Sequence, residues 1–309
     1  MIKLFLGIDG GGTKTDVICT DEHGTEFGSG SSGPTNLTST SVGAASFNLK
    51  EAVRQALEKV TEEYQLESVV MGLAGLDTEQ EYEIAHKTFL EIIKLFGGQR
   101  LTLMNDSMIA LANGTDSPNA VILISGTGSI CYGRNAQGAT ERVGGMDFLL
   151  TDQGSGYDIG RHVLREAVKS ADGRRSKTVL EQLVCEHFGI QSIAHLKNEV
   201  YNPPLSKIEI AELAQLCSRG FDAHDEASID IFKWSEVELA LLAATTLKKL
   251  QLENTPTDLV LSGSVLSISH VRQALETRLK QDFPSLTILF PEKPPTYGAL
   301  KLALKEHVV

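Results

Sequence analysis

Residues 7–19, which read GIDGGGTKTDVIC, constrain the fold more than any other stretch of the chain. An apolar run over residues 2–8 leads into three consecutive glycines, and apolar and polar residues alternate after them over residues 15–19. This pattern predicts a buried strand, a tight turn and a second strand. Residues 21–24 (DEHG) then indicate a hairpin turn into a third strand that runs through Phe27.

A glycine turn of this kind can bind an anion, because bare backbone lets successive N–H groups approach a phosphate. Thr13 and Thr15 add hydroxyl donors, and Lys14 adds a positive charge. Asp9, at the end of the first strand, is placed to face a metal ion that accompanies the phosphates. The known GxxxxGK[ST] and GxGxxG loops do not fit, since they lead into a helix. The alternative interpretation is an ordinary tight turn with a solvated Lys14.

The same pattern returns in residues 120–145, VILISGTGSICYGRNAQGATERVGG after the first alanine. An apolar strand leads into a GTGS turn, a second strand through Tyr132, an Asn-Ala-Gln-Gly turn and a third strand. Ser125 then takes the position that Asp9 has in the first copy. An internal repeat of a whole supersecondary unit is the mark of a duplicated fold, so it favours phosphate binding over an ordinary turn.

Periodicity predicts the other elements. Residues 29–43 are rich in Gly, Ser, Thr and Pro and are expected to form a loop. Helices are expected at residues 44–64, 79–96, 158–170, 176–188, 208–219, 227–250, 271–279 and 297–306. Strands are expected at residues 68–73, 100–104, 258–261 and 286–290.

The composition limits the function classes. A chain of 309 residues exceeds the usual size of one domain, so two domains with a cleft between them are expected. The net charge of −12 argues against nonspecific binding to nucleic acid or to an anionic membrane. Neither a membrane span nor a signal peptide is indicated, so a cytoplasmic protein is expected. The four cysteines show no metal-binding spacing and are interpreted as buried free thiols.

Seven motifs together resemble the BadF/BadG/BcrA/BcrD-type ATPase family, and in particular its N-acetylglucosamine kinase branch. They are GIDGGGTKT, GPTN (33–36), GLAGLD (72–77), NDS (105–107), LISGTGS (123–129), GGMDFLLTDQGSGYDIG (144–160) and LSGSV (261–265). The resemblance covers nearly the whole chain. It implies an α/β fold of two ribonuclease H-like lobes, the duplicated actin-like ATPase fold of the sugar kinase, heat-shock 70 and actin superfamily. The lobes would comprise residues 1–117 with 294–309, and residues 118–293.

Carried onto matching positions, the resemblance also implies site residues. The first phosphate loop would be Gly11, Gly12, Thr13 and Lys14, and the second Gly126, Thr127 and Gly128. Gly263 and Ser264 would face the adenosine of ATP, and Asp9 the Mg²⁺. Asp106 would accept the proton of the sugar hydroxyl. The sugar would be held by Asn36, Gly75, Asp77, Asp106, Gly145, Met146 and Asp152.

Several of these residues have simpler interpretations. Asp106 is also suited to capping a helix that begins near Met108. Asp152 is also suited to capping residues 154–160, and Asn36 to forming an Asx turn. These alternatives stay open from the sequence alone.

The resemblance implies an ATP- and Mg²⁺-dependent kinase for an amino sugar, first of all N-acetylglucosamine, acting as a homodimer. Glucosamine and N-acetylmuramic acid are the alternative sugars, and an ATPase activator of a 2-hydroxyacyl-CoA dehydratase or an actin-like filament protein are the alternative classes. The chain departs from the branch where GGWG is replaced by GGMD. The carboxylate of Asp147 would favour a free 2-ammonium group, unless it faces solvent.

Overall fold

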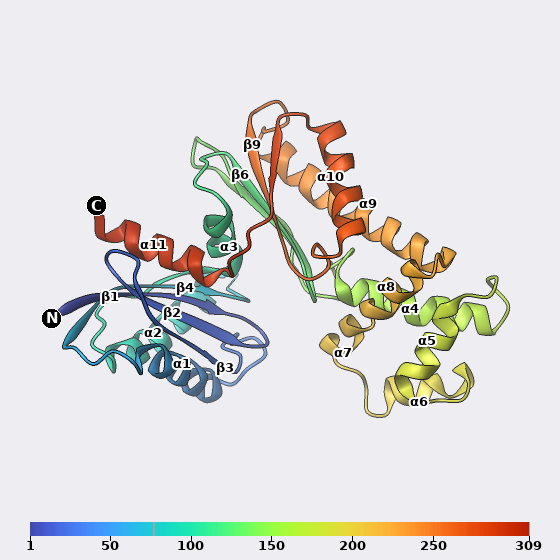
Figure 1. The fold of residues 1–309 in the computed structure, drawn as a ribbon, viewed down its shortest axis with the longest axis horizontal. Coiled ribbons are helices and arrows are strands. Elements are labelled where there is room, and N and C mark those ends of the chain that lie inside the picture. The colour runs from blue at the N-terminus through green and yellow to red at the C-terminus, as the bar shows by residue number, and fades with distance from the viewer. Residues whose placement is uncertain (77, 309) are drawn as a thin grey trace. The chain divides into compact units, whose positions relative to one another are not determined.

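The computed structural model describes residues 1–76 and 78–308. The chain folds into two compact units, Met1–Asp116 with Pro291–Val309, and Ser117–Phe290. Figure 1 shows that each unit contains one sheet with helices packed on it. The two units are described separately below.

The sheet of the first unit has the order β3-β2-β1-β4-β5. Its strands are β1 (Ile2–Gly10), β2 (Thr15–Asp21), β3 (Glu26–Ser32), β4 (Tyr64–Leu73) and β5 (Thr102–Asn105). The first three strands are antiparallel, and β4 and β5 run parallel to β1. The predicted strand, glycine turn, strand and hairpin are therefore confirmed.

Both faces of this sheet are buried, which explains the continuous apolar run in β1. Leu4, Leu6 and Ile8 pack with α1 (Val42–Leu57) and α2 (Glu79–Lys94) on one face. Alternation along the strand turns Phe5 to the other face, where α3 (Asp106–Gly114) and α11 (Thr296–Val308) pack. Gly7 allows this approach, because a Cβ there would lie 2.3 Å from the backbone oxygen of Thr296.

The predicted loop over residues 29–43 is partly wrong, because β3 continues to Ser32. The glycines that suggested a loop instead let α1 pack closely on this strand. A Cβ at Gly30 would lie 2.0 Å from the backbone oxygen of Ala52 in α1. Helix α1 itself ends at Leu57, and β4 begins at Tyr64, so residues 58–64 are not helical as expected.

The second unit repeats the sheet with the order β10-β9-β6-β7-β8. Its strands are β6 (Ala120–Ser125), β7 (Ser129–Arg134), β8 (Thr140–Gly144), β9 (Thr257–Ser262) and β10 (Leu286–Leu289). As in the first unit, the first three strands, β6, β7 and β8, are antiparallel. The strands β9 and β10 run parallel to β6 and extend the sheet on the side of β6 away from β7. The duplication expected from the sequence is confirmed by this matching topology.

Helices form most of the rest of the second unit. They are α4 (Gly156–Ala171), α5 (Val179–Phe188), η1 (Ile193–His195), α6 (Leu196–Tyr201), α7 (Lys207–Glu212), α8 (Ala214–Asp222), α9 (Glu226–Lys249) and α10 (Ser269–Asp282). The single helix expected over residues 208–219 is two helices that meet at Leu213. Cys19, Cys131 and Cys217 are buried as expected, whereas Cys185 is half-buried.

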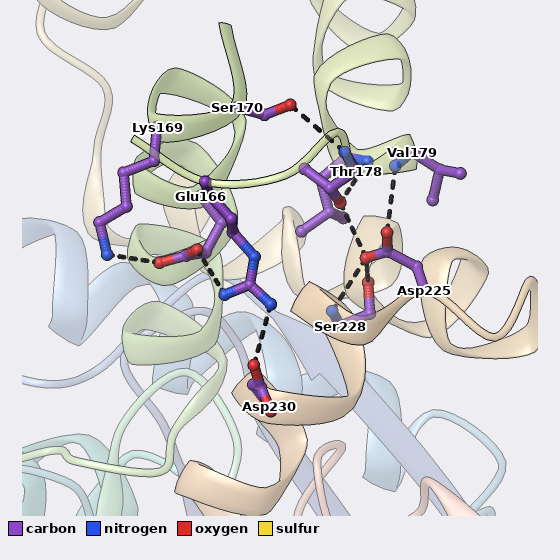
Figure 2. Close-up of polar contacts among 10 residues, drawn as sticks. Glu166, Lys169, Ser170, Thr178, Val179, Asp225, Ser228 and Asp230 are labelled. Carbon is purple, nitrogen blue, oxygen red and sulfur yellow. Dashed lines mark hydrogen bonds and ion pairs between the residues drawn. The ribbon is translucent and has the colours of Figure 1, made fainter. Parts of the chain in front are cut away.

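A polar network joins α4, α5 and α9 (Figure 2). The carboxylate of Asp225 caps α9 by accepting a hydrogen bond from the backbone N–H of Ser228 at 3.0 Å, and it also accepts one from the first N–H of α5, that of Val179, at 3.2 Å. Arg175 bridges Glu166 and Asp230, at 2.9 Å from each. These contacts fix the directions of the three helices relative to one another within the second unit.

Candidate functional site

The first glycine turn closes the hairpin between β1 and β2 and is exposed at its tip. The N–H of Gly11 donates to the oxygen of Lys14 at 2.9 Å, which makes the turn tight. Two neighbouring segments bind to the same turn: Thr35 N–H donates to Gly11 O at 3.2 Å, and Ala74 N–H donates to Gly10 O at 2.9 Å. The structure therefore brings the GGGTKT, GPTN and AGLD motifs together at one end of the sheet.

Gly12 and Thr13, at the tip of this turn, are exposed, as is the side chain of Lys14. The ammonium of Lys14 lies 2.6 Å from the carboxylate of Asp16, although 68% of the lysine side chain is exposed. The long exposed stem allows the ammonium to leave this contact for a stronger anion such as a phosphate. Both predicted roles of Lys14, solvated residue and phosphate ligand, are compatible with this position.

Asp9 lies at the end of β1, directly opposite Asp16 in the register of the hairpin. The pKa of Asp9 is raised to about 7, first by burial and then by the carboxylates of Asp106 and Asp16, against the opposing effect of Lys14. Three carboxylates thus influence one another around the first turn. Excess negative charge of this kind is neutralised when a cation binds.

Asp106 follows β5 and is the first residue of α3. The register of the sheet places Gly10, Leu73 and Asn105 in one row across β1, β4 and β5, which is why Asp106 comes near Asp9. The alternative in which Asp106 caps a helix near Met108 is wrong, since Asn105 is the cap. Oδ1 of Asn105 accepts hydrogen bonds from the N–H of Ser107 at 3.0 Å and from the hydroxyl of Ser107 at 2.6 Å.

Asn36 and Gly75 are also adjacent in the first unit. A Cβ at Gly75 would lie 2.7 Å from Oδ1 of Asn36, and Gly75 has a φ of 73°. Asn36 forms the Asx turn considered above, because its Oδ1 accepts from the N–H of Thr38 at 2.9 Å. That bond uses the oxygen, and among the described residues the Nδ2 group donates no hydrogen bond. Asp77 lies outside the described residues.

The second glycine turn, Gly126 to Gly128, closes the hairpin between β6 and β7. The N–H of Gly126 donates to Gly128 O at 3.0 Å, and the start of α4 binds the turn through the Gly156 N–H, which donates to Gly126 O at 2.7 Å. Tyr157 N–H likewise donates to Thr127 O at 3.3 Å. The first residues of α4 are therefore hydrogen-bonded to this turn, a contact that the sequence motifs did not reveal.

Gly263 and Ser264 follow β9 and lie against the same turn. Gly263 has a φ of 104°, and a Cβ there would lie 2.2 Å from the backbone oxygen of Ser125. A Cβ at Gly126 would lie 4.0 Å from the hydroxyl oxygen of Ser264. Glycine is needed at residue 263 both for its left-handed backbone and for its closeness to the end of β6.

Asp152 is buried beside the second turn, with a positive φ of 69°. Its Oδ1 accepts a hydrogen bond from the N–H of Ser129 at 3.0 Å, and a Cβ at Gly128 would lie 2.8 Å from its Oδ2. Asp152 does not cap α4, because Ser155 does so through the N–H of Asp158. The capping alternative considered for Asp152 is therefore wrong.

Lys207, at the start of α7, is the residue that the sequence analysis missed. Its ammonium lies 2.8 Å from Oδ2 of Asp152 and 2.5 Å from Oδ1 of Asp147. Burial lowers the pKa of Lys207, but hydrogen bonds to these two carboxylates outweigh it, and the pKa is raised. The carboxylate of Asp147, which was expected either to meet a substrate ammonium or to face solvent, is paired with a lysine of the chain itself.

Gly145 and Met146 precede this pair in an exposed loop. Gly145 has a φ of 72°, and the N–H of Met146 donates to the hydroxyl of Thr151 at 2.7 Å, which closes the loop. The side chains of Met146, Leu149 and Leu150 are 64%, 82% and 67% exposed. Three exposed apolar side chains in one short loop are typical of a surface that a ligand or another part of the protein covers.

The residues of the first unit fit a magnesium ion that accompanies a nucleotide. Among the described residues, no group of three or more His, Cys, Asp and Glu side chains is arranged to hold a metal alone. Mg²⁺ does not need such a cage, because it binds through one or two carboxylates, waters and phosphate oxygens. Asp9, buried and surrounded by negative charge, is the carboxylate that suits this mode of binding.

Two matching sheets, each with a glycine turn after its first strand, define the class: an ATPase with the duplicated actin-like fold. A solved structure from Chromobacterium violaceum, provisionally assigned as an N-acetylglucosamine kinase, shares this fold with a TM-score of 0.75 at 22% identity, over 98% of this chain and 99% of that one. The model of the BadF/BadG/BcrA/BcrD ATPase family matches residues 6–303. The chain belongs to this family.

Curated relatives match the chain over nearly its full length. An N-acetylmuramic acid/N-acetylglucosamine kinase of Clostridium acetobutylicum is 30% identical over 308 residues, which cover 99% of both chains. An N-acetyl-D-glucosamine kinase of Dictyostelium discoideum is 30% identical over 316 residues, which cover 98% of both chains.

Among the helices of the described residues, none combines the length and the hydropathy that a membrane span requires.

Proposed function

We propose that the protein is an ATP-dependent kinase that phosphorylates an amino sugar, with N-acetylglucosamine and its 6-phosphate as the first substrate and product. The observation that carries this proposal is the position of Asp106, a carboxylate next to Asp9 at the end of the sheet that holds the first glycine turn. Phosphoryl transfer requires donors for phosphate oxygens, a metal ligand and a base near the attacking hydroxyl. Full-length similarity to amino-sugar kinases supports it.

In the proposed reaction, Asp106 accepts the proton of the sugar 6-hydroxyl while that oxygen bonds to the γ-phosphorus of ATP. The bond from the γ-phosphorus to the bridging oxygen breaks, and ADP leaves. The backbone N–H groups of Gly12 and Thr13 bind phosphate oxygens, with the ammonium of Lys14 nearby. Asp9 would hold Mg²⁺, which supplies charge neutralisation for the transferred group.

The second unit would contribute the other half of the nucleotide site. The turn of Gly126, Thr127 and Gly128 suits phosphate binding for the same reason as the first turn, and Gly263 with Ser264 would contact the adenosine. Asn36 and Gly75 from the first unit, and Gly145, Met146 and Asp152 from the second, would hold the sugar. Asp77 keeps its predicted role as a further sugar ligand. A homodimer in the cytoplasm stays part of this proposal.

A panel of sugars assayed for ATP-dependent phosphorylation tests the proposal directly. We expect N-acetylglucosamine to have the highest kcat/KM, ahead of N-acetylmuramic acid and glucosamine. No phosphorylation of any amino sugar would contradict the kinase assignment, and a preference for another sugar in the panel would change the substrate only.

Asp106→Asn tests the role of the base. The change is nearly isosteric, and we expect kcat to fall by about 10² to 10⁴ while ATP still binds. Asp116→Asn is the matched control, since this exposed residue follows the end of α3 and pairs with Lys301. An Asp106→Asn protein with the parent rate would show that this carboxylate is not the base.

A further inference from the structure

The second unit contains a cavity of about 960 Å³ between α4, η1, α6 and the start of α7. Its volume is at the upper end of the range of small-molecule binding sites, roughly 300–1,000 Å³. Of the residues that line it, only Tyr157 was named in the candidate functional site above, for the hydrogen bond from its backbone N–H to Thr127 O. We propose that this cavity binds an organic anion that has an apolar body and one carboxylate or phosphate head.

The inner wall of the cavity is apolar. It is lined by Leu164 and Val168 from α4, by Ile193 and Leu196 from η1 and α6, and by Ile210 from α7. Ile193 and Leu196 are buried, at 9% and 4% exposure. A wall of this kind favours a hydrocarbon or aromatic body, because removing apolar surface from water stabilises binding by about 25 cal/mol per Å².

The charged residues of the cavity are almost all cations. Five basic side chains line it against the single carboxylate of Asp172; they are Arg161, Arg165, Lys169, Arg174 and Lys197. This concentration stands out in a chain with a net charge of −12. The positive charge opposes the charge of the chain as a whole, so it marks a surface that suits an anion.

Ion pairs within the protein account for only part of this charge. Arg161 pairs with Asp158 at 2.6 Å, and Lys169 pairs with Glu166 at 2.7 Å. Arg174 pairs with Asp172 at 2.6 Å. Among the described residues, no carboxylate forms an ion pair with either of the remaining two cations, Arg165 and Lys197, so these two are available for the head of a ligand.

The combination of wall and charge narrows the ligand class. A sugar or an inorganic phosphate would leave the apolar wall in contact with water, and a neutral hydrocarbon would gain no attraction from the two exposed cations. An apolar cation would be repelled. An amphipathic anion satisfies both surfaces at once, since its body covers the wall and its head forms charge-assisted hydrogen bonds with arginine and lysine.

Fluorescence titration of the full chain with dansyl-labelled undecanoate tests the proposal. We expect saturable binding that decanoate and decyl phosphate displace, with decanol at least about tenfold weaker and decyltrimethylammonium without effect. All compounds are used below the concentrations at which they form micelles. Displacement by decanoate alone or by decyl phosphate alone identifies the head group as carboxylate or phosphate, and either result supports the proposal.

The double variant Arg165→Gln/Lys197→Gln removes the two unpaired cations while keeping polar side chains. We expect its affinity for the probe to fall about tenfold or more. Lys233→Gln, an exposed lysine of α9 outside the cavity, is the matched control and should bind as the parent does. Unchanged affinity in the double variant, equal displacement by the ammonium compound, or displacement of the probe by a non-hydrolysable ATP analogue would overturn the proposal.

Discussion

Replacing Lys207 by methionine removes the ammonium that lies between Asp147 and Asp152 while keeping an unbranched side chain of similar length. The two ion pairs differ in environment. The side chain of Asp152 is 4% exposed, that of Asp147 is 66% exposed, and Lys207 itself is 28% exposed. The substitution therefore leaves one nearly buried carboxylate without its charged partner, while the other is solvated by water.

The expected loss in the free energy of unfolding follows from these exposed fractions. Breaking a fully buried pair by removing one partner costs about 3–5 kcal/mol, and an exposed pair contributes about 0–1 kcal/mol. Because water reaches Lys207, we expect Lys207→Met to lower the free energy of unfolding of the second unit by about 2–3 kcal/mol. For a unit of this size, that loss corresponds to a fall in Tm of roughly 4–12 °C.

Tryptophan fluorescence provides a selective assay. The chain has one tryptophan, Trp234 in α9, whose indole N–H donates to Oδ2 of Asp158 at 3.1 Å. Its emission therefore reports the unfolding of the second unit. Lys177→Met is the matched control, since Lys177 is 77% exposed in its pair with Glu181 and the change should cost less than about 1 kcal/mol.

A double-mutant cycle shows whether the contact with Asp152 is responsible. In Asp152→Asn/Lys207→Met no buried charge is left unpaired, so we expect the double variant to be more stable than the two single losses added together, by about 1 kcal/mol or more. If the two losses simply add, or if Lys207→Met unfolds with the parent, the reasoning from burial is refuted.

Three further predictions use the same structure. Asp225→Ala removes the cap of α9 and the acceptor for the first N–H of α5, and should lower the free energy of unfolding, followed by the fluorescence of Trp234, by about 2 kcal/mol or more; a loss under about 0.5 kcal/mol would contradict the role of Asp225 at both helices. Gly160→Ala places a Cβ 1.8 Å from the backbone oxygen of Ile210 and should destabilise by about 1–3 kcal/mol in urea, whereas Gly43→Ala, with open space around it, should not. Asp147→Gly should change kcat/KM for glucosamine and for N-acetylglucosamine by the same factor, because Lys207 already pairs with this carboxylate; a selective loss for glucosamine would show that Asp147 reads the 2-substituent.

Local sequence determined much of the fold. The apolar runs, the glycine turns and the alternation after them predicted both hairpins, and the repeat of this pattern predicted two sheets of one topology. These features depend on residues close in sequence, whose backbone preferences and periodicity act over short stretches. The same locality explains the error over residues 29–32: Gly30 was interpreted as a loop residue, although it is a strand residue that α1 approaches closely.

Tertiary structure decided which side chains meet. Asp106 lies near Asp9 only because β4 stands between β1 and β5 in parallel register. Lys207 meets Asp147 and Asp152 across 60 and 55 residues of sequence, from a helix of six residues with no motif of its own. The sequence alone determined the hairpins and their duplication. Contacts between distant side chains depend on how whole helices pack, so only the folded structure could place Lys207 beside the second glycine turn.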